Sequence, residues 1–314
     1  MNTWLIGAGY MAREYSKVLL SKQIIFDVIG RGDNSAQHFE SLTGKPVITG
    51  GLKECLKSKE PPDQAIVAVG VEDLSETAQI LIKSGVKRIL LEKPGGINFE
   101  EIKKLKDISK KNSCTLLLAY NRRFYASTAH VREMIKDDGG VSSFNFEFTE
   151  WSHTIAPLVK GPGVKESWFL SNSSHLVDLA FHICGFPDEL YALNSGSLTW
   201  HPSSSVFSGS GRTDQNILFS YIADWTSAGR WRLEIMTSKR RIILSPLEEI
   251  KVIKVGTLVE KKINISDELD QQFKPGIYQM LNSFFAKDDK FFCSIEEQLS
   301  HLKIYNKMAG YSRK

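Results

Sequence analysis

The fold is decided near the start of the chain, by the stretch Trp4-Leu5-Ile6-Gly7-Ala8-Gly9-Tyr10-Met11-Ala12. Its first three residues predict a short buried strand, and the residues up to Leu20 have helical spacing. Between strand and helix lies the pattern Gly-x-Gly-x-x-Ala. The first glycine permits a tight turn, the second lets a pyrophosphate approach the backbone, and the small third residue lets the helix pack on the strand. The stretch therefore predicts a dinucleotide-binding turn in which Gly7, Ala8, Gly9, Tyr10 and Met11 face the phosphates.

Short apolar strands then alternate with helices. We expect strands at residues 24–29, 46–48, 64–69, 86–91 and 114–119, and helices at 53–57, 75–83, 99–111 and 127–136. Most of these strands are apolar on both faces, which is typical of a parallel sheet covered by helices. The sequence therefore predicts an α/β Rossmann domain, a doubly wound parallel sheet, over residues 1–122.

The pattern changes from about residue 141. Segments become longer, alternate between apolar and polar residues, and are rich in aromatic and β-branched side chains. Such strands are typical of an antiparallel sheet with one face exposed to water. Helices are expected at 174–184 and at 294–308, and the second of these is expected to pack back on one of the domains. Residues 123–314 are thus predicted to form an α+β domain with a large, mostly antiparallel open sheet.

Composition excludes several classes of protein. The 314 residues are 42% hydrophobic and 24% charged, with a formal net charge of +4. The densest basic stretch, residues 103–111, has the spacing of a solvated helix face, so we expect no nucleic-acid partner. We find no secretory signal and no apolar run long enough for a bilayer, and therefore expect no membrane partner. The four cysteines form no Cys-x-x-Cys pair, which favours free thiols in the cytoplasm and no metal site.

Polar residues follow the strands at their carboxyl ends, where a parallel sheet binds its ligands. The strand ending at Leu91 continues into Glu92-Lys93-Pro94. Pro94 holds Lys93 out of the helical region, so this lysine is a candidate to orient a substrate hydroxyl or relay its proton. Gly70 forms a small turn after another strand, beside the expected cofactor.

The end of the second strand bears on the choice of cofactor. Arg31 stands where an NAD-selective protein usually has a carboxylate. A guanidinium suits a ribose 2′-phosphate, so NADP(H) is favoured. Asp33 lies two residues later and would serve a ribose hydroxyl, which leaves NAD(H) open.

These motifs together resemble the family of glucose–fructose oxidoreductase, inositol dehydrogenase and the rhizopine catabolism proteins (Gfo/Idh/MocA). The resemblance rests on residues 7–12, on Glu92-Lys93-Pro94, on Asn121-Arg122-Arg123-Phe124 and on His175-Leu176-Val177-Asp178. It implies a Rossmann domain followed by an α+β domain that binds substrate and forms oligomers. It also implies nicotinamide-dependent chemistry on sugar or cyclitol carbons, in homodimers or homotetramers packed through the open sheet.

The resemblance also implies two catalytic residues. Lys93 matches the family's catalytic lysine, and His175 matches the histidine of its His-x-x-Asp motif. A histidine titrates near neutral pH and can carry the proton that moves on the substrate oxygen, while an ammonium stabilises a developing alkoxide. Beside the cofactor we further expect Glu92 and Asn121. Near the substrate we expect a second set of side chains: Arg122, Arg123, Tyr125, Trp151 and Asp178.

The sequence departs from the family at two places. Many members carry an aspartate four residues before the histidine, where this chain has Ser171. The family's histidine after the fourth strand is also missing, and Leu74 lies near that place. The relay of Lys, Asp and His is therefore not intact, and the substrate pocket must differ.

Three functions stay open. We favour an oxidoreductase for a sugar or nucleotide-sugar CH–OH group, in bacterial surface-polysaccharide synthesis rather than in catabolism. A cofactor-binding regulator or scaffold without activity is the first rival, favoured by Ser171. The second rival is a lyase or hydrolase that uses transient oxidation by bound NAD. The basic loop 160–165 is either a lid over a nucleotide-sugar pyrophosphate or an ordinary surface loop.

Overall fold

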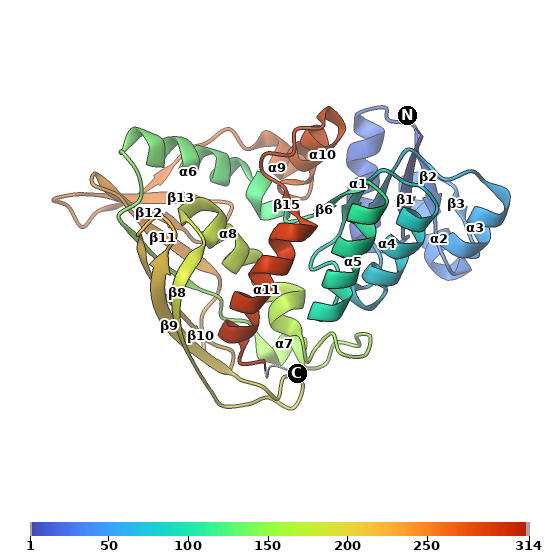
Figure 1. The fold of residues 1–314 in the computed structure, drawn as a ribbon. Coiled ribbons are helices and arrows are strands. Elements are labelled where there is room, and N and C mark those ends of the chain that lie inside the picture. The colour runs from blue at the N-terminus through green and yellow to red at the C-terminus, as the bar shows by residue number, and fades with distance from the viewer. Residues whose placement is uncertain (1, 312–314) are drawn as a thin grey trace. The chain divides into compact units, whose positions relative to one another are not determined.

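The computed structural model describes residues 2–311 (Figure 1). The chain forms two compact units, each with its own sheet. Of the described residues, the first unit contains 2–120 and Gln272–Ser300. The second contains Asn121–Gln271 and 301–311.

The first unit is built on a seven-stranded sheet with the order β15-β6-β5-β4-β1-β2-β3. All neighbouring strands are parallel except β15, which is antiparallel to β6. Every residue of β1, β4 and β5 is buried, as the apolar runs predicted. The strands are β1 (Thr3–Ile6), β2 (Asp27–Ile29), β3 (Val47–Ile48), β4 (Gln64–Val67), β5 (Arg88–Leu91), β6 (Thr115–Leu118) and β15 (Cys293–Ser294).

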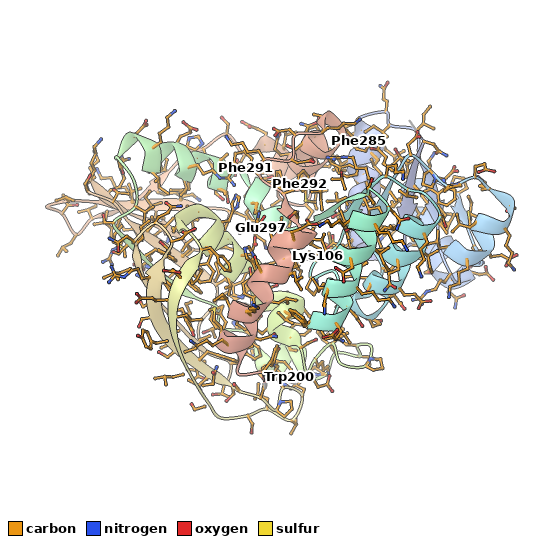
Figure 2. The ribbon with its side chains drawn as sticks, viewed as in Figure 1. Lys106, Trp200, Phe285, Phe291, Phe292 and Glu297 are labelled. Carbon is orange, nitrogen blue, oxygen red and sulfur yellow. The ribbon has the colours of Figure 1, made fainter. Side chains whose placement is uncertain are left out.

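The helices of this unit follow from local sequence signals, as α5 illustrates. The side chain of Asn98 accepts a hydrogen bond of 2.9 Å from the backbone N–H of Glu101 and caps this helix. Ile102 and Leu105 are buried, whereas Lys106 and the other lysines remain exposed or half-buried (Figure 2). The solvated face predicted from the lysine spacing is thus confirmed. The helices are α1 (Tyr10–Ser21), α2 (Asp33–Thr43), α3 (Leu52–Ser58), α4 (Leu74–Lys83), α5 (Phe99–Lys111) and α10 (Ile277–Ala286).

A late segment of the chain, Gln272–Ser300, returns to the first unit. Its helix α10 packs on α1, and β15 covers the edge of β6. Arg88 at the start of β5 forms an ion pair with Asp289. The boundary expected after residue 122 assigned this whole segment to the second domain, and the structure differs. An uncovered β6 would expose unpaired backbone groups, which explains why a distant strand pairs there.

The second unit is built on an eight-stranded sheet with the order β14-β13-β12-β11-β7-β10-β9-β8. Neighbours are antiparallel except β7 and β10, which are parallel. The strands are β7 (Ser143–Glu147), β8 (Pro187–Ser195), β9 (Val206–Thr213), β10 (Leu218–Asp224), β11 (Arg232–Met236), β12 (Arg240–Leu244), β13 (Ile250–Lys254) and β14 (Glu260–Ile263). The helices are α6 (Ala126–Asp137), α7 (Ser152–Ile155), α8 (Ser174–Cys184) and α9 (Glu268–Gln272), while α11 (Ile295–Ala309) begins in the first unit and ends in the second.

One face of this sheet carries the core of the second unit. Helix α8 packs on β7 and β11. Phe181 of α8 meets Phe144 and Phe146 of β7 edge to face. A further aromatic pair, Trp200 (labelled in Figure 2) and Trp225, stacks with ring planes only 4° apart. The residues of β10 alternate between buried and exposed, so the predicted sheet with one water-facing side is confirmed.

Several regular elements escaped the sequence prediction: α2, α7, β9, α9, α10 and β15. Strand β9 has the sequence Val-Phe-Ser-Gly-Ser-Gly-Arg-Thr, whose central five residues lack the usual strand formers. Side chains at Gly209 and Gly211 would collide with the rings of Tyr221 and Phe219, so the glycines make room for these two aromatics. Helix α2 buries only Ala36 and Phe39, and its hydrophobic pattern is correspondingly weak.

The fold class is as predicted: a Rossmann-type parallel sheet and a second unit with a mostly antiparallel sheet. The helices predicted at 99–111 and 174–184 coincide with α5 and α8. Among residues 2–311, no helix has both the length and the hydropathy needed to cross a bilayer.

Candidate active site

The glycine turn follows β1. Gly7 has φ of +118°, a conformation that side-chain-bearing residues rarely adopt, and its N–H donates to the carbonyl of Ile29 at 2.8 Å. A Cβ at Gly7 would also collide with the carbonyl oxygen of Ala68. The ends of β1, β2 and β4 lie so close together here that only a glycine fits at position 7, whether or not the turn binds a ligand.

The second glycine of the turn has a different environment. Gly9 precedes α1 in an extended conformation, and a Cβ built there would meet no heavy atom within 4 Å. Neither a side-chain cap nor an acidic residue neutralises the first turn of α1. The positive end of the helix dipole thus remains available, next to a backbone that a pyrophosphate can approach. The turn therefore fits a dinucleotide.

Tyr10 and Met11 open the helix, while the two alanines of the motif are buried. Tyr10 is 56% exposed, and the ammonium of Lys274 lies 5.4 Å from the centre of its ring. Lys274 comes from the segment that returns to the first unit, so it adds a positive charge beside the turn that the sequence did not predict.

The other predicted cofactor residues of the first unit follow neighbouring strands. Gly70 comes after β4, Lys93 after β5 and Arg31 after β2. In the sheet, β4 and β2 are the two neighbours of β1, and β5 lies on the far side of β4. The structure therefore gathers the predicted cofactor residues 7–11, 31, 70, 92 and 93 along one edge. Carboxyl ends of parallel strands at the point where the strand order reverses form the ligand crevice of this architecture.

Arg31 lies exposed at the end of β2. Its guanidinium pairs with the carboxylate of Asp73 at 2.6 Å, and 74% of the side chain is accessible. Asp33 is exposed in the first turn of α2, after Gly32. The guanidinium thus stays open to a phosphate, although Asp73 competes with any such anion.

The Glu92-Lys93-Pro94 turn is held from two sides. Tyr15 of α1 donates a hydrogen bond of 2.7 Å to Glu92, and burial, followed by the charge of Glu92, raises the pKa of Tyr15 well above its usual value. Gln298 of α11 donates to the carbonyl of Pro94 at 3.1 Å. Lys93 itself is only 6% exposed, and the bond between Lys93 and Pro94 is cis.

Gln298 has a second bond that extends this support. Its side-chain oxygen accepts a hydrogen bond of 3.1 Å from the hydroxyl of Tyr120, at the end of the strand beside β5. The amide is fully buried. Sequence reasoning missed Gln298, because a glutamine in a C-terminal helix carries no signal that links it to a turn 204 residues earlier.

In the second unit, Asn121, Arg122 and Arg123 lie in a 3-10 turn, Asn121–Phe124. The Arg122 guanidinium donates to the side chain of Asn121 at 2.9 Å. Arg123 donates twice to Asp178 of α8, at 2.8 and 2.6 Å, and both residues are at most 1% exposed. This buried fork fixes the turn against α8. Because both residues are buried and paired with each other, the structure favours a positioning role for Arg123 and Asp178 over the substrate contact expected for them.

His175 is the second residue of α8, directly after a π-helical turn, Phe169–Ser173. It is 7% exposed, and its ring centre lies 6.4 Å from that of Trp231. Ser171 lies within the π-helical turn, and its hydroxyl is 3.4 Å from that of Ser167. The carboxylate expected at position 171 by comparison with the family is thus replaced by a hydroxyl.

A buried carboxylate lies close to the same turn. Glu150, just beyond β7, accepts hydrogen bonds from Asn172 at 2.8 Å and from Ser173 at 2.7 Å, and Arg230 bonds to its other oxygen at 3.2 Å. Burial raises the pKa of Glu150, against the opposing effect of Ser173 and Arg230. The only sequence signal was an acidic residue at the end of an apolar alternating strand.

The remaining candidates of the second unit have clear neighbours. Trp151 is 46% exposed and donates to the carbonyl of Gly229 at 2.9 Å. Tyr125 is buried, and burial raises its pKa to about 12. His182 meets the guanidinium of Arg132 at 2.8 Å, and burial lowers its pKa to about 2, so it is a neutral packed histidine. Leu74, at the place of the family's second histidine, is fully buried.

Comparison with known proteins adds to this geometry. Residues 1–120 match the family model GFO_IDH_MocA, described as an oxidoreductase family with an NAD-binding Rossmann fold. No match to a curated protein was found.

Solved structures similar to the chain include three dehydrogenases or oxidoreductases. UDP-N-acetylglucosamine 3-dehydrogenase GnnA from Acidithiobacillus ferrooxidans has a TM-score of 0.74 at 14% identity, over 98% of this chain and 96% of that chain. Levoglucosan dehydrogenase in complex with NADH and L-sorbose has a TM-score of 0.77 at 16% identity, over 98% and 95%. The NAD binding oxidoreductase from Klebsiella pneumoniae has a TM-score of 0.78 at 13% identity, over 100% and 97%.

At these identities the structural likeness establishes the fold of the whole chain. The family match concerns the unit that carries the glycine turn and Lys93. Residues 1–120 therefore match the Gfo/Idh/MocA oxidoreductase family with its NAD-binding Rossmann fold, the family that the sequence motifs resemble.

Proposed function

We propose that the chain is a nicotinamide-dependent dehydrogenase or reductase for a CH–OH group of a sugar or nucleotide sugar. The observation that carries this proposal is the buried Lys93 at the end of β5, on the same sheet edge as the glycine turn. The sugar dehydrogenases among the structural relatives support the substrate class. The bound nicotinamide would supply or accept the hydride.

Separate groups of the protein bind the cofactor, stabilise charge on the substrate and transfer the proton in this proposal. Gly9 and the N-terminus of α1 hold the pyrophosphate, as the open backbone there allows. Lys93 stabilises negative charge on the substrate oxygen, and His175 takes or returns the proton. Glu150 fixes the turn that carries His175 through its bonds to Asn172 and Ser173.

We further propose NADP(H) as the preferred cofactor, with Arg31 holding the 2′-phosphate. Its support is the exposed guanidinium at the end of β2. Asp33 remains the group that would serve NAD(H). The free thiols of all four cysteines suit the cytoplasm, which we propose as the compartment. A homodimer or homotetramer formed through the open sheet completes the proposal.

The test is turnover of a panel of sugars with both cofactors, followed by nicotinamide absorbance. The panel includes UDP-N-acetylglucosamine and levoglucosan, on which the relatives act by name. We expect at least one sugar to change the absorbance. Lys93→Met is expected to abolish that change while the affinity for cofactor stays within about twofold. Activity that persists in Lys93→Met would overturn the assignment of Lys93.

Ser171 favours a second candidate, a cofactor-binding regulator without turnover. This candidate predicts tight cofactor binding and no absorbance change with any sugar. A third outcome, a sugar product formed while the absorbance returns to its starting value, would indicate the lyase or hydrolase that recycles bound NAD. Mass spectrometry of the denatured protein's supernatant would then identify the retained cofactor.

A further inference from the structure

Two arginines and two tryptophans of the second unit form a cation–π cluster. The guanidinium of Arg230 lies 4.9 Å from the ring centre of Trp151 and 5.2 Å from that of Trp231. The guanidinium of Arg122 also lies 5.2 Å from the Trp231 ring. At such distances a guanidinium is attracted to the face of an indole ring. The cluster therefore presents two cationic groups held against aromatic rings, from segments far apart in the sequence.

The donors of this cluster outnumber its acceptors. Among residues 2–311, Arg230 bonds only to Glu150, at 3.2 Å, and the side chain of Arg122 only to Asn121, at 2.9 Å. Each guanidinium has five N–H donors. The side chain of Arg230 is also 48% exposed, so it remains accessible to a ligand. In the described part of the chain, Glu150 is the one carboxylate paired with the cluster. Its single negative charge does not balance the two positive charges of Arg122 and Arg230.

Two buried N–H groups of the cluster also lack an acceptor. Within the described chain, the Nε of Arg122 and the indole nitrogen of Trp231 have no hydrogen-bond partner. Trp231 is 93% buried, as its exposure of 7% shows. Buried donors are normally satisfied, so each such group needs an explanation. An oxygen-rich ligand would satisfy both groups, and an anion would also balance the charge.

The position of the cluster connects it to the proposed chemistry. Trp231 contacts His175, with ring centres 6.4 Å apart. Arg230 and the turn before His175 share the same carboxylate, Glu150. A ligand bound at the cluster would therefore lie beside the histidine to which we assign proton transfer.

We propose that Arg122, Trp151, Arg230 and Trp231 form a subsite for a negatively charged group of the substrate. The proposal rests on the proposed function and narrows its substrate class to anionic sugars. The recognised chemistry is an oxyanion with two or more oxygens, which pairs with a guanidinium edge in two parallel bonds. Such an oxyanion has two sources: the carboxylate of a sugar acid, or the phosphates of a sugar nucleotide.

The experiment is a titration of tryptophan fluorescence in the intact chain, since Trp151 and Trp231 lie in the subsite. The probes are D-glucuronate, inorganic pyrophosphate and UDP, with uncharged D-glucose as the reference. We expect at least one anionic probe to bind at least tenfold more tightly than D-glucose, with an affinity that falls as salt rises. Tight glucuronate binding would identify a carboxylate, and tight pyrophosphate and UDP binding would identify phosphates.

Substitutions locate the binding. Arg230→Gln is expected to weaken the binding of the tightest anionic probe about tenfold or more. Arg230→Lys should cause a smaller loss of affinity, because a lysine keeps the positive charge but lacks the planar guanidinium with its paired N–H groups. Arg212→Gln also removes one positive charge, but from an exposed position on β9, and is expected to leave the affinity for the anionic probes unchanged. Arg122→Gln serves as a second variant should Arg230→Gln unfold.

The outcomes separate this inference from the proposed function. Equal binding of anionic probes and D-glucose, or unchanged anion binding in folded Arg230→Gln, would overturn the subsite. NADPH binding and sugar turnover would still stand in that case. Conversely, anion binding that depends on Arg230 in a protein without nicotinamide binding would keep the subsite and refute the dehydrogenase.

Discussion

Single buried side chains of this protein carry consequences for stability, and His182 is the clearest case. Burial, followed by the positive charges of Arg123 and Arg132, lowers its pKa from 6.5 to about 2. The folded chain therefore keeps His182 neutral at pH values where the unfolded chain protonates it. Its contribution to stability is complete above the unfolded pKa and is lost as the pH falls below it.

His182→Gln is expected to reduce this pH dependence, because an uncharged amide can still accept from Arg132. Between about pH 6 and about pH 5, the wild type should lose about 1 kcal/mol more unfolding free energy than the variant. Urea unfolding at the two pH values measures this difference. Equal losses in both proteins would show that His182 is protonated in the folded state.

Arg31 and Asp73 govern the choice of cofactor in our proposal. Arg31→Ala is expected to weaken the binding of NADPH about tenfold, or about 1.4 kcal/mol, and to leave the affinity for NADH unchanged. Asp73→Asn frees the guanidinium from its ion pair and is expected to strengthen NADPH binding. Fluorescence titration of each variant with both nucleotides is the measurement. If Arg31→Ala binds neither NADPH nor NADH, the result would refute a specific contact between Arg31 and the 2′-phosphate.

Residues that matter through distant contacts could not be predicted from the sequence. The glycine turn, Glu92-Lys93-Pro94 and the segment around His175 carry local signals, and the strand ends place them as expected. Gln298, Glu150 and the cluster around Arg230 carry none, because their roles depend on partners from other elements. Tertiary contacts, rather than spacing, determine what these side chains do.

At the scale of elements, α11 supports the Glu92-Lys93-Pro94 turn through Gln298. Gln298→Leu keeps the side-chain volume but removes both bonds. We expect turnover to fall about tenfold, because a small displacement of a catalytic group is costly, while NADPH affinity stays within about twofold. Ser300→Ala, an exposed change on the same helix, is the matched control. Unchanged turnover in Gln298→Leu would show that the turn is held without this amide.

Elements were predictable where the hydrophobic pattern alone determines them. Helix α5 has one buried apolar face, helix α8 is apolar along most of its length, and both were placed correctly. Strand β9 was missed because its glycines serve the rings of Phe219 and Tyr221. The sequence predicts a C-terminal helix that packs back on one of the domains. The return of α10 and β15 to the first unit was missed, because neither β15 nor β6 carries a sequence signal for their pairing.

At the scale of the whole molecule, the exposed face of the eight-stranded sheet bears on assembly. Leu193 of β8, Ser208 of β9 and Ile222 of β10 form one cross-strand row. Leu193 is 74% exposed and Ile222 is 56% exposed, with a small serine between them. Tyr191 and Leu218 extend this apolar area on the flanking strands, and such patches often mark interfaces between subunits.

Ile222→Glu is therefore expected to dissociate the proposed homo-oligomer, because a charge would be buried without a partner. Sedimentation velocity of the wild type and the variant measures the assembly. Val159→Glu, on an exposed loop away from the sheet strands, is the control and should leave the assembly unchanged. A monomeric wild type, or an Ile222→Glu variant that still assembles, would remove this face from the interface.

The central claim is that the turn after β1 binds a nicotinamide dinucleotide, and Gly9 tests it most directly. A Cβ at this position meets no heavy atom of the protein within 4 Å, so Gly9→Val should fold normally. Its side chain would occupy the place through which the pyrophosphate reaches the backbone. The measurement is a fluorescence titration of wild type and Gly9→Val with NADPH and NADH. We predict that the wild type binds at least one nucleotide and that folded Gly9→Val binds at least a hundredfold more weakly, or about 2.7 kcal/mol. Equal binding by both proteins would contradict the account.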